Sequence, residues 1–405
     1  MANTKMRFEI MKTAKVKLCA SLCMLLGIVT WIGHVKLDVW SVVIRLGIEQ
    51  PLKAPGVLFP VANEQIHVVN RPRKAELRDE KSFDVSSSNA QLDNVIEHRV
   101  FWSAWLDGLS TTVFDEEHER KWREQVRDAR VVLLEAGCGR PTNRLATFAD
   151  GSRACVRYGI DADQVLGETL SYYLAKLLEI TNLPPMALSK LNISSEQWAS
   201  VSENIEALEW SPNAIVSLTK FLPNVSAVFI PLPLRKQQGR GLQPSPEIIS
   251  NMTIPNLVEL IQWTDLILFD YLTANFDRIV SHIFSLQWDA RVMERATNNL
   301  LKTTSGHLVF IDNEAGLIHG YRVLDLWERY HRTLLSSSCV FRRSTARRIA
   351  EMKRSGNAAK LLFELYRARE PFARELGCLS EVQALTLQSR IAVVHKHINQ
   401  CTEIK

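Results

Sequence analysis

The sequence predicts an α+β fold in which a small strand-rich N-terminal lobe precedes a helical C-terminal lobe, behind an N-terminal membrane anchor. Three observations predict it: apolar runs broken by turn residues at 129–160, helix-like apolar spacing through most of the later chain, and an uncharged stretch at 18–33. The composition, 46% hydrophobic and 23% charged over 405 residues, is that of a folded protein. A net charge of +5 is too small to indicate nucleic-acid binding.

The N-terminal stretch LCASLCMLLGIVTWIG follows a segment rich in Lys and Arg. A positive flank favours a cytosolic N-terminus, so the sequence predicts a cytoplasmic tail at 1–17, a signal-anchor transmembrane helix at 18–35 and a luminal body. Residues 36–97 are polar with little apolar periodicity and are predicted to form a stem before a folded domain at 98–405. A cleaved signal peptide is the alternative, because the apolar run is short for a membrane span.

Two further features fit a luminal body. Sequons for N-glycosylation occur at Asn192, Asn224 and Asn251. The cysteines after the anchor are Cys138, Cys155, Cys339, Cys378 and Cys401. They show no zinc spacing, so disulfides in an oxidising compartment are expected, and two bonds among five cysteines can be drawn in about 15 ways.

The predicted elements follow in order along the chain. The apolar face of 97–109, with Val100, Phe101, Trp102 and Trp105, marks the start of the folded domain. Residues 129–160 are predicted to form strands, with a turn at Asp150-Gly151. Helices are predicted at 161–180, 256–273, 342–366 and 380–400, a strand at 306–313, and a surface loop at 232–247.

Two aspartates follow buried-looking elements. Asp277 lies in a loop after the long apolar helix, within FDYLTANFDRIVSH, and Asp312 comes directly after a strand, within LVFIDNEAGL. Asp277 fits a general base, or a turn residue at a helix end. Asp312 fits a metal ligand, or an Asx-turn residue that ends a strand. Strands, a helix and then a helical lobe with two loop aspartates are the layout of a protein kinase.

A kinase also needs groups that hold the phosphates. Arg157, on a predicted strand, and Glu168, on the following helix, fit the phosphate-binding cation and its helix partner. Otherwise Arg157 is an exposed strand cation and Glu168 a residue favoured by the helix dipole. Gly137 and Gly139, with Asn143, are candidates for the loop that covers the phosphates, although glycine-rich turns are common without a ligand.

The Asp-Ala-Asp sequence at 161–163 supports a different hypothesis. Golgi glycosyltransferases use an Asp-x-Asp pair to hold a metal and a nucleotide sugar, and Asp161 with Asp163 match that pattern. A helix starts here, however, and Asp is a common N-cap residue. The structural interpretation is therefore the simpler one.

Several long stretches closely resemble the Four-jointed family of Golgi luminal kinases. They are RACVRYGI, GETLSYYLAKLL, WTDLILFDYLTANFDR, FSLQWDARVMERAT, LVFIDNEAGLIHGYRV and CVFRRSTARR. The resemblance covers residues 98–405 and extends more distantly to the secretory-pathway kinases that include the Golgi casein kinase. It implies an atypical protein-kinase-like fold.

The resemblance also implies a function and a location. It implies a type II Golgi membrane protein that uses ATP and a divalent metal, Mn²⁺ or Mg²⁺. The expected substrates are Ser or Thr residues in extracellular cadherin repeats of the Fat and Dachsous proteins, with effects on planar cell polarity and growth. Release of a cleaved, secreted form is a further expectation. A non-catalytic pseudokinase or shed ligand is the alternative within this family.

Residue roles carry over position by position. The resemblance implies that Asp277 is the catalytic base, Asp312 the metal ligand, Glu168 the helix glutamate and Arg157 the phosphate-binding cation. Kinases commonly have an Asn metal ligand five residues after the base, where this sequence has His282. Histidine can bind manganese but binds magnesium poorly, so the metal preference is expected to shift.

The same resemblance implies the cysteine pairing. Relatives suggest that Cys339 pairs with Cys401, which would tie the C-terminal helix to its lobe. Cys138 would then pair with Cys155, and Cys378 would remain free.

Overall fold

The computed structural model describes residues 94–110, 114–159, 161–235, 242 and 252–403. The predicted anchor at 18–35, the stem up to residue 93 and the sequon at Asn251 lie outside the described residues. No helix among the described residues has both the length and the apolar character needed to cross a membrane.

A five-stranded antiparallel sheet forms the first lobe, in the order β3-β4-β5-β7-β6. Its strands are β3 (Val131–Ala136), β4 (Arg144–Phe148), β5 (Arg153–Arg157), β6 (Met186–Lys190) and β7 (Ile215–Lys220). The predicted turn at Asp150-Gly151 is confirmed, since it joins β4 to β5 with Gly151 at φ +83°. The expectation of a mostly helical chain after 161 is wrong for β6 and β7. Four consecutive residues of β6 are buried, so its sequence lacks the alternation that identifies a strand.

Helix α4 (Glu116–Asp128) packs on this sheet, although the sequence did not predict it. It has only two apolar residues, Trp122 and Val126, one turn apart. The Trp122 indole donates to the Leu218 carbonyl at 3.1 Å and meets the Phe148 ring edge-on. These side chains belong to a hydrophobic core of their own, separate from the core of the helical lobe.

Helices α5 (Ala162–Leu177) and α9 (Ile254–Thr273) form the centre of the second hydrophobic core. Both were predicted within a few residues. The Asp161 side chain caps α5 by accepting from the Gln164 backbone N–H. Helix α9 ends at Ala274, which adopts the left-handed conformation and turns the chain towards Asp277.

A second, three-stranded antiparallel sheet lies beside α9. Its strands are β8 (Ser226–Phe229), β9 (Ala296–Lys302) and β10 (Leu308–Phe310), in the order β10-β9-β8. The predicted strand at 306–313 corresponds to β10, which is fully buried and ends two residues before Asp312.

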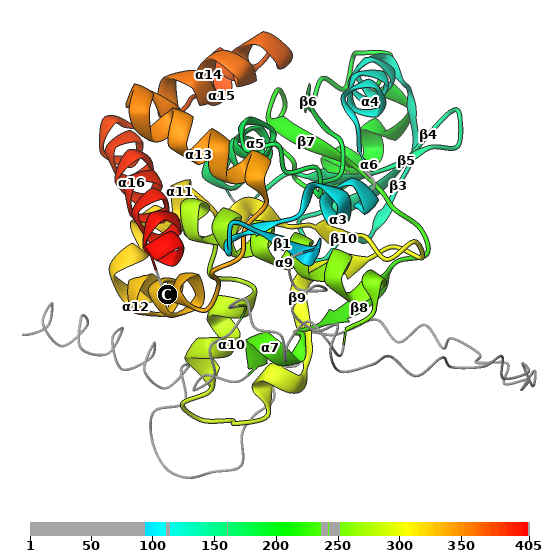
Figure 1. The fold of residues 1–405 in the computed structure, drawn as a ribbon. Coiled ribbons are helices and arrows are strands. Elements are labelled where there is room, and N and C mark those ends of the chain that lie inside the picture. Colours follow the sequence, from blue (N-terminus) through cyan, green and yellow to red (C-terminus); the bar gives the residue numbers. More distant parts are fainter. Residues whose placement is uncertain (1–93, 111–113, 160, 236–241, 243–251, 404–405) are drawn as a thin grey trace, which may run out of the picture. The chain divides into compact units, whose positions relative to one another are not determined.

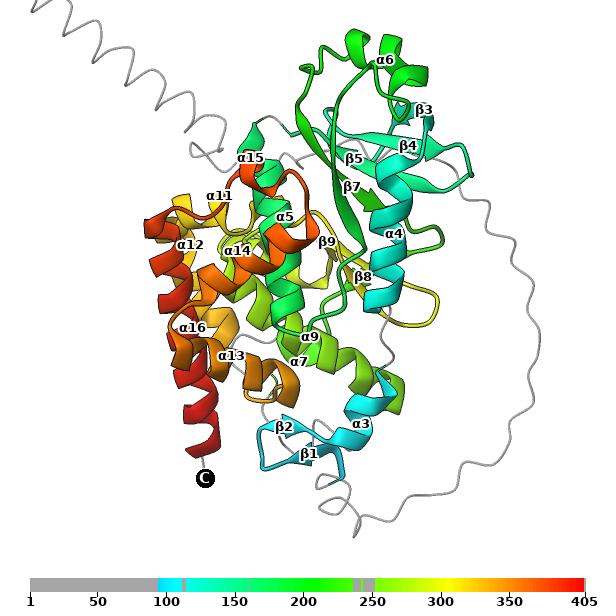
Figure 2. The ribbon, with the colours of Figure 1, turned by 90° about the horizontal axis from the view of Figure 1, so that it is seen from above.

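The C-terminal helices lie on the opposite side of α5 from the five-stranded sheet (Figures 1 and 2). They are α12 (Leu324–Ser336), α13 (Arg343–Ser355), α14 (Ala358–Arg369), α15 (Ala373–Leu376) and α16 (Glu381–Glu403). The single helix predicted at 342–366 is wrong. Gly356, at φ +64°, ends α13, and α14 begins two residues later.

The remaining elements are short. They are β1 (Ile96–Glu97), β2 (Phe101–Trp102), α3 (Ala104–Leu109), α6 (Ser202–Ala207), α7 (Leu232–Arg235), α10 (Ile279–Ser285) and α11 (Ile318–Arg322), with 3₁₀ turns at Ala199–Val201, Val292–Glu294 and Asn313–Ala315. Two expectations need correction. Trp105 is 54% exposed while Leu106 is buried, because α3 turns its Leu106 face inward. Residues 232–235 form α7 where a loop was expected.

Candidate active site

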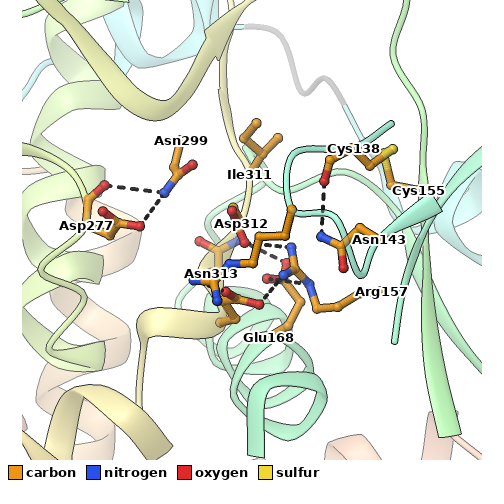
Figure 3. Close-up of polar contacts among 12 residues, drawn as sticks. Cys138, Asn143, Cys155, Arg157, Glu168, Asp277, Asn299, Ile311, Asp312 and Asn313 are labelled. Carbon is orange, nitrogen blue, oxygen red and sulfur yellow. Dashed lines mark hydrogen bonds and ion pairs between the residues drawn. A yellow bond between two sulfur atoms is a disulfide. The ribbon is translucent and has the colours of Figure 1, made fainter. Parts of the chain in front are cut away.

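Arg157 lies at the centre of a cluster of three carboxylates. Its Nη2 is 2.6 Å from Asp312 Oδ1, its Nη1 pairs with Glu314 Oε2, and its Nε is 3.8 Å from Glu168 Oε2. The sheet supplies Arg157 at the end of β5, and α5 supplies Glu168. Three of the predicted site residues thus meet where the two lobes join (Figure 3).

Asp277 lies beside this cluster and is held by an amide (Figure 3). Asn299 on β9 donates from Nδ2 to Asp277 Oδ2 at 2.9 Å, and the Asp277 backbone N–H donates to Asn275 Oδ1 at 3.0 Å. The second Asp277 oxygen is not part of these bonds. Sequence reasoning missed Asn299, because nothing in the sequence pattern indicates that an Asn 22 residues after Asp277 contacts it.

Arg278 joins the segments that carry Asp277 and Asp312. It is fully buried, with Nη1 2.5 Å from Asp270 Oδ1, Nη2 2.9 Å from the Ile311 carbonyl and Nε 3.1 Å from the Asn299 carbonyl. A fourth bond goes to Asn313 Oδ1. One side chain therefore ties α9, β9 and the chain after β10 together. The sequence places Arg278 next to Asp277 but does not indicate its burial.

The loop between β3 and β4 reaches the same cluster. Cys138 and Gly139 have φ of +60° and +87°, and the Asn143 side chain donates to the Cys138 carbonyl at 3.1 Å. A Cβ at Gly137 would lie 3.1 Å from Leu145 Cβ, so the loop packs tightly at its base. From this loop Arg140 Nη2 lies 2.5 Å from Glu314 Oε1. Arg140 is the contact that sequence reasoning missed here.

The turn after β10 presents its acidic residues in an unusual backbone conformation. Asp312 has φ +55° and ψ +58°, a left-handed conformation that is uncommon outside glycine but is better tolerated by Asp and Asn. Asn313 bonds to Glu168 Oε1 at 3.3 Å and to the Phe310 carbonyl at 3.2 Å. Gly167 on α5 makes this approach possible, since a Cβ there would lie 2.9 Å from the Glu314 carbonyl oxygen.

The electrostatics follow from burial and from the crowding of carboxylates. Burial raises the pKa of Asp277, and the nearby Asp312 charge raises it further, while Arg278, Asn299 and Arg140 oppose the shift. Burial also raises the pKa of Glu168 and of Glu314, against the opposing charge of Arg157. Burial disfavours the Arg157 cation, but the surrounding carboxylates outweigh it and raise its pKa. The site thus contains more carboxylates than cations.

The donor atoms at this site are of the type that a hard divalent cation prefers. The Asp312 charge contributes to the raised pKa of Asp277, and Glu168 Oε2 is buried without a hydrogen-bond partner. Oxygen donors of this kind suit Mg²⁺ or Mn²⁺, and a cation would relieve the repulsion between the carboxylates. Asp312, whose side chain is 23% exposed, is the residue best placed to hold it.

His282 occupies a different environment from the other predicted metal ligand. It lies buried on α10, with Nδ1 3.3 Å from the Arg278 carbonyl, and burial lowers its pKa. In the part of the chain that is described, the only set of three or more His, Cys, Asp and Glu ligand atoms within 4.8 Å of one another contains Cys339, His397 and Cys401. Neither His282 nor Glu168 is brought into such a set with Asp277 and Asp312 among the described residues, so the metal-binding roles of His282 and Asp312 stay predictions.

The two cysteine pairings expected from the resemblance are both present. Cys138 is bonded to Cys155 and Cys339 to Cys401, while Cys378 is free and exposed. The first bridge anchors the β3–β4 loop to β5, and the second ties the end of α16 to the segment before α13.

The remaining predicted sites lie away from the cluster. Asn192 and Asn224 are exposed in loops, as glycosylation requires. Asp161 caps α5, and Asp163 pairs with Arg322 across the surface. Both aspartates of the Asp-Ala-Asp sequence thus have structural contacts.

Comparison with solved structures identifies the class of fold. The described structure is similar to the crystal structure of the Golgi casein kinase, with a TM-score of 0.51 over 83% of this chain and 95% of that chain, at 11% identity. The fold is therefore kinase-like and mixes helices with sheets.

Sequence comparison identifies the family. Residues 117–404 match the Four-jointed box protein middle domain. Four-jointed box protein 1 of Xiphophorus maculatus is 56% identical over 308 residues, which are 76% of this chain and 72% of that protein. The extracellular serine/threonine protein kinase four-jointed of Drosophila melanogaster is 33% identical over 355 residues, covering 76% of this chain and 61% of that protein. This chain belongs to the Four-jointed box family.

Proposed function

We propose that this protein is a serine/threonine protein kinase of the Golgi lumen that transfers the γ-phosphate of ATP to extracellular cadherin repeats. The observation that carries the proposal is the Arg157 cluster, in which a strand cation, a helix glutamate and the Asp312 that follows β10 meet beside Asp277. Phosphoryl transfer needs this combination of a phosphate-binding cation, a metal-binding carboxylate and a base.

The proposed mechanism is direct in-line transfer. The acceptor Ser or Thr hydroxyl gives its proton to Asp277 as its oxygen attacks the γ-phosphorus, the bond to the β–γ bridging oxygen breaks, and ADP leaves. The hydrogen bond from Asn299 holds one Asp277 oxygen and leaves the other for the hydroxyl. The raised pKa of Asp277 makes it a stronger base than an exposed aspartate.

Asp312 would hold the metal, and Arg157 would hold the phosphates. A divalent metal supplies neutralisation of phosphate charge at this site. Arg157 presents a planar fork that suits two phosphate oxygens, in place of the point charge of lysine. Glu168, on α5, orients the Arg157 guanidinium group through their ion pair.

The choice of acceptor, the compartment and the role in planar polarity rest on family membership. The Drosophila relative is named an extracellular serine/threonine protein kinase, and two disulfides with exposed sequons fit an oxidising lumen. Cadherin repeats of Fat and Dachsous type as acceptors, a signal anchor at 18–35 and a cleaved, secreted form belong to the same proposal.

The test compares phosphate and sugar donors. The chain, produced through the secretory pathway, is incubated with manganese and either labelled ATP or labelled UDP-sugars, with a cadherin-repeat fragment as acceptor. We expect label from ATP alone, and loss of that label in Asp312→Asn. Incorporation from a UDP-sugar would favour the glycosyltransferase alternative, and nucleotide binding without transfer would favour the pseudokinase.

A further inference from the structure

Arg140 and Arg157 hold one carboxylate between them. Arg140 Nη2 contacts Oε1 of Glu314, and Arg157 Nη1 contacts Oε2 of the same group. The two cations come from different segments, the β3–β4 loop and the end of β5, yet both bind the same carboxylate. A phosphate group offers oxygens of the same charge at similar spacing.

The Cys138–Cys155 disulfide sets the spacing of this pair. Each arginine lies two residues after a bridged cysteine, Arg140 after Cys138 and Arg157 after Cys155. The bridge fixes the loop against β5, and the Cys138 carbonyl is held in turn by Asn143. The loop that carries Arg140 is therefore anchored at its start by a covalent bond.

The two arginines differ in exposure and in the number of their ion pairs. The Arg157 side chain is 12% exposed and contacts three carboxylates, whereas the Arg140 side chain is 43% exposed and forms an ion pair with Glu314 alone among the described residues. Arg140 can therefore leave Glu314 at lower cost than Arg157 can. An incoming anion would displace Glu314 from Arg140 before it displaced Glu314 from Arg157.

We infer that Arg140 is a phosphate-binding residue that acts together with Arg157, that Glu314 is their counter-ion when no nucleotide is bound, and that the Cys138–Cys155 bridge positions the pair. This inference rests on the proposed nucleotide-binding function and assigns a residue to it. The pair recognises the diphosphate of the nucleotide and makes no contribution to recognition of the adenosine.

The test measures binding, not turnover. Fluorescent ADP and adenosine analogues are titrated into the full chain with manganese. We expect Arg140→Ala to weaken ADP binding by about 10- to 100-fold, as for loss of a charged hydrogen bond, and to leave adenosine binding unchanged. Arg153→Ala is the matched control, because that β5 cation stacks on Phe221 instead.

Two further variants test the counter-ion and the bridge. Glu314→Gln should increase ADP binding without metal, and adding Arg140→Ala should cancel that gain.

Cys138→Ser/Cys155→Ser should lower the affinity for ADP relative to that for adenosine. Cys339→Ser/Cys401→Ser should leave the ratio of the two affinities unchanged, because that bridge lies in the helical lobe. ADP binding equal to wild type in Arg140→Ala would overturn the inference alone. Failure of the wild-type chain to bind ADP would overturn the proposed function as well.

Discussion

Arg278 Nη1 lies 2.5 Å from Asp270 Oδ1, and both side chains are completely buried. The pair joins α9 to the loop that carries Asp277. Arg278 also donates to the carbonyls of Ile311 and Asn299, so three segments of the site share one cation. Burial raises the pKa of Asp270 to about 6, against the opposing effect of Arg278.

Removal of this cation should be among the most damaging substitutions in the helical lobe. Arg278→Met leaves a buried carboxylate without its partner and several acceptors without a donor, and we expect a loss of about 3–5 kcal/mol in the free energy of unfolding at neutral pH. Urea denaturation measures it. Arg295→Met is the control, because its exposed pair with Asp289 should contribute no more than about 1 kcal/mol.

The stability lost in Arg278→Met should be smaller at acidic pH than at neutral or alkaline pH. The folded-state pKa of Asp270 lies above its ordinary 3.8, so as pH falls through about 6 the folded protein takes up this proton before the unfolded chain does. Without Arg278 that pKa rises further, so the destabilisation in Arg278→Met should be smaller at pH 5 than at pH 8. Adding Asp270→Asn should recover part of the loss at pH 8 and little at pH 5. A loss equal at both pH values would contradict a charged pair.

The hydrogen bond from Asn299 should lower the pKa of Asp277, the proposed base. Burial and Asp312 raise that pKa. Asn299→Ala removes a lowering contribution, so the acidic limb of the kcat/KM profile, where Asp277 becomes protonated, should move to higher pH. Asn298→Ala, at the exposed neighbouring position of β9, should leave the limb in place. Identical pH profiles for the two variants would contradict a role of Asn299 in setting the pKa of Asp277.

Gly167 should be required for close packing of the Asp312 turn. An alanine in a helix interior normally stabilises by about 0.5–1 kcal/mol relative to glycine. At Gly167 the new Cβ would press on the Glu314 carbonyl oxygen at 2.9 Å, and such overpacking costs about 1–3 kcal/mol. We therefore expect Gly167→Ala to unfold at lower urea concentration than the parent. Gly108→Ala, with no atom within 4 Å of its Cβ, should not.

Both described sequons should carry glycans. Asn192 and Asn224 are exposed in loops, and the Asn192 Oδ1 accepts from the Ser194 backbone N–H at 3.1 Å in a turn that the Ser195 N–H closes on the Asn192 carbonyl. After passage through the secretory pathway, Asn192→Gln and Asn224→Gln should each remove one glycosidase-sensitive step in electrophoretic mobility. A mobility insensitive to glycosidase would argue against a luminal body.

The sequence predicted those parts of the site that follow single, strongly patterned elements. The long apolar helix and the short buried strand indicated that Asp277 and Asp312 each lie in a loop shortly after a buried element, and the resemblance to the Four-jointed family assigned their roles. It did not predict Arg140, Arg278 or Asn299, whose roles arise only from contacts between distant segments. A buried arginine has the same one-dimensional signal as an exposed one, and a fully buried strand such as β6 lacks the alternation that marks a strand.

The central claim is that Asp277 is the base of a phosphate-transfer reaction. The most direct measurement is the amount of phosphate transferred from labelled ATP with manganese to a cadherin-repeat fragment, with wild-type protein and Asp277→Asn compared side by side. We expect transfer by the wild type and a reduction of about 10²- to 10⁴-fold in the variant, with ADP binding retained. Equal transfer by a folded Asp277→Asn protein, or none by a folded wild type that binds ADP, would contradict this account.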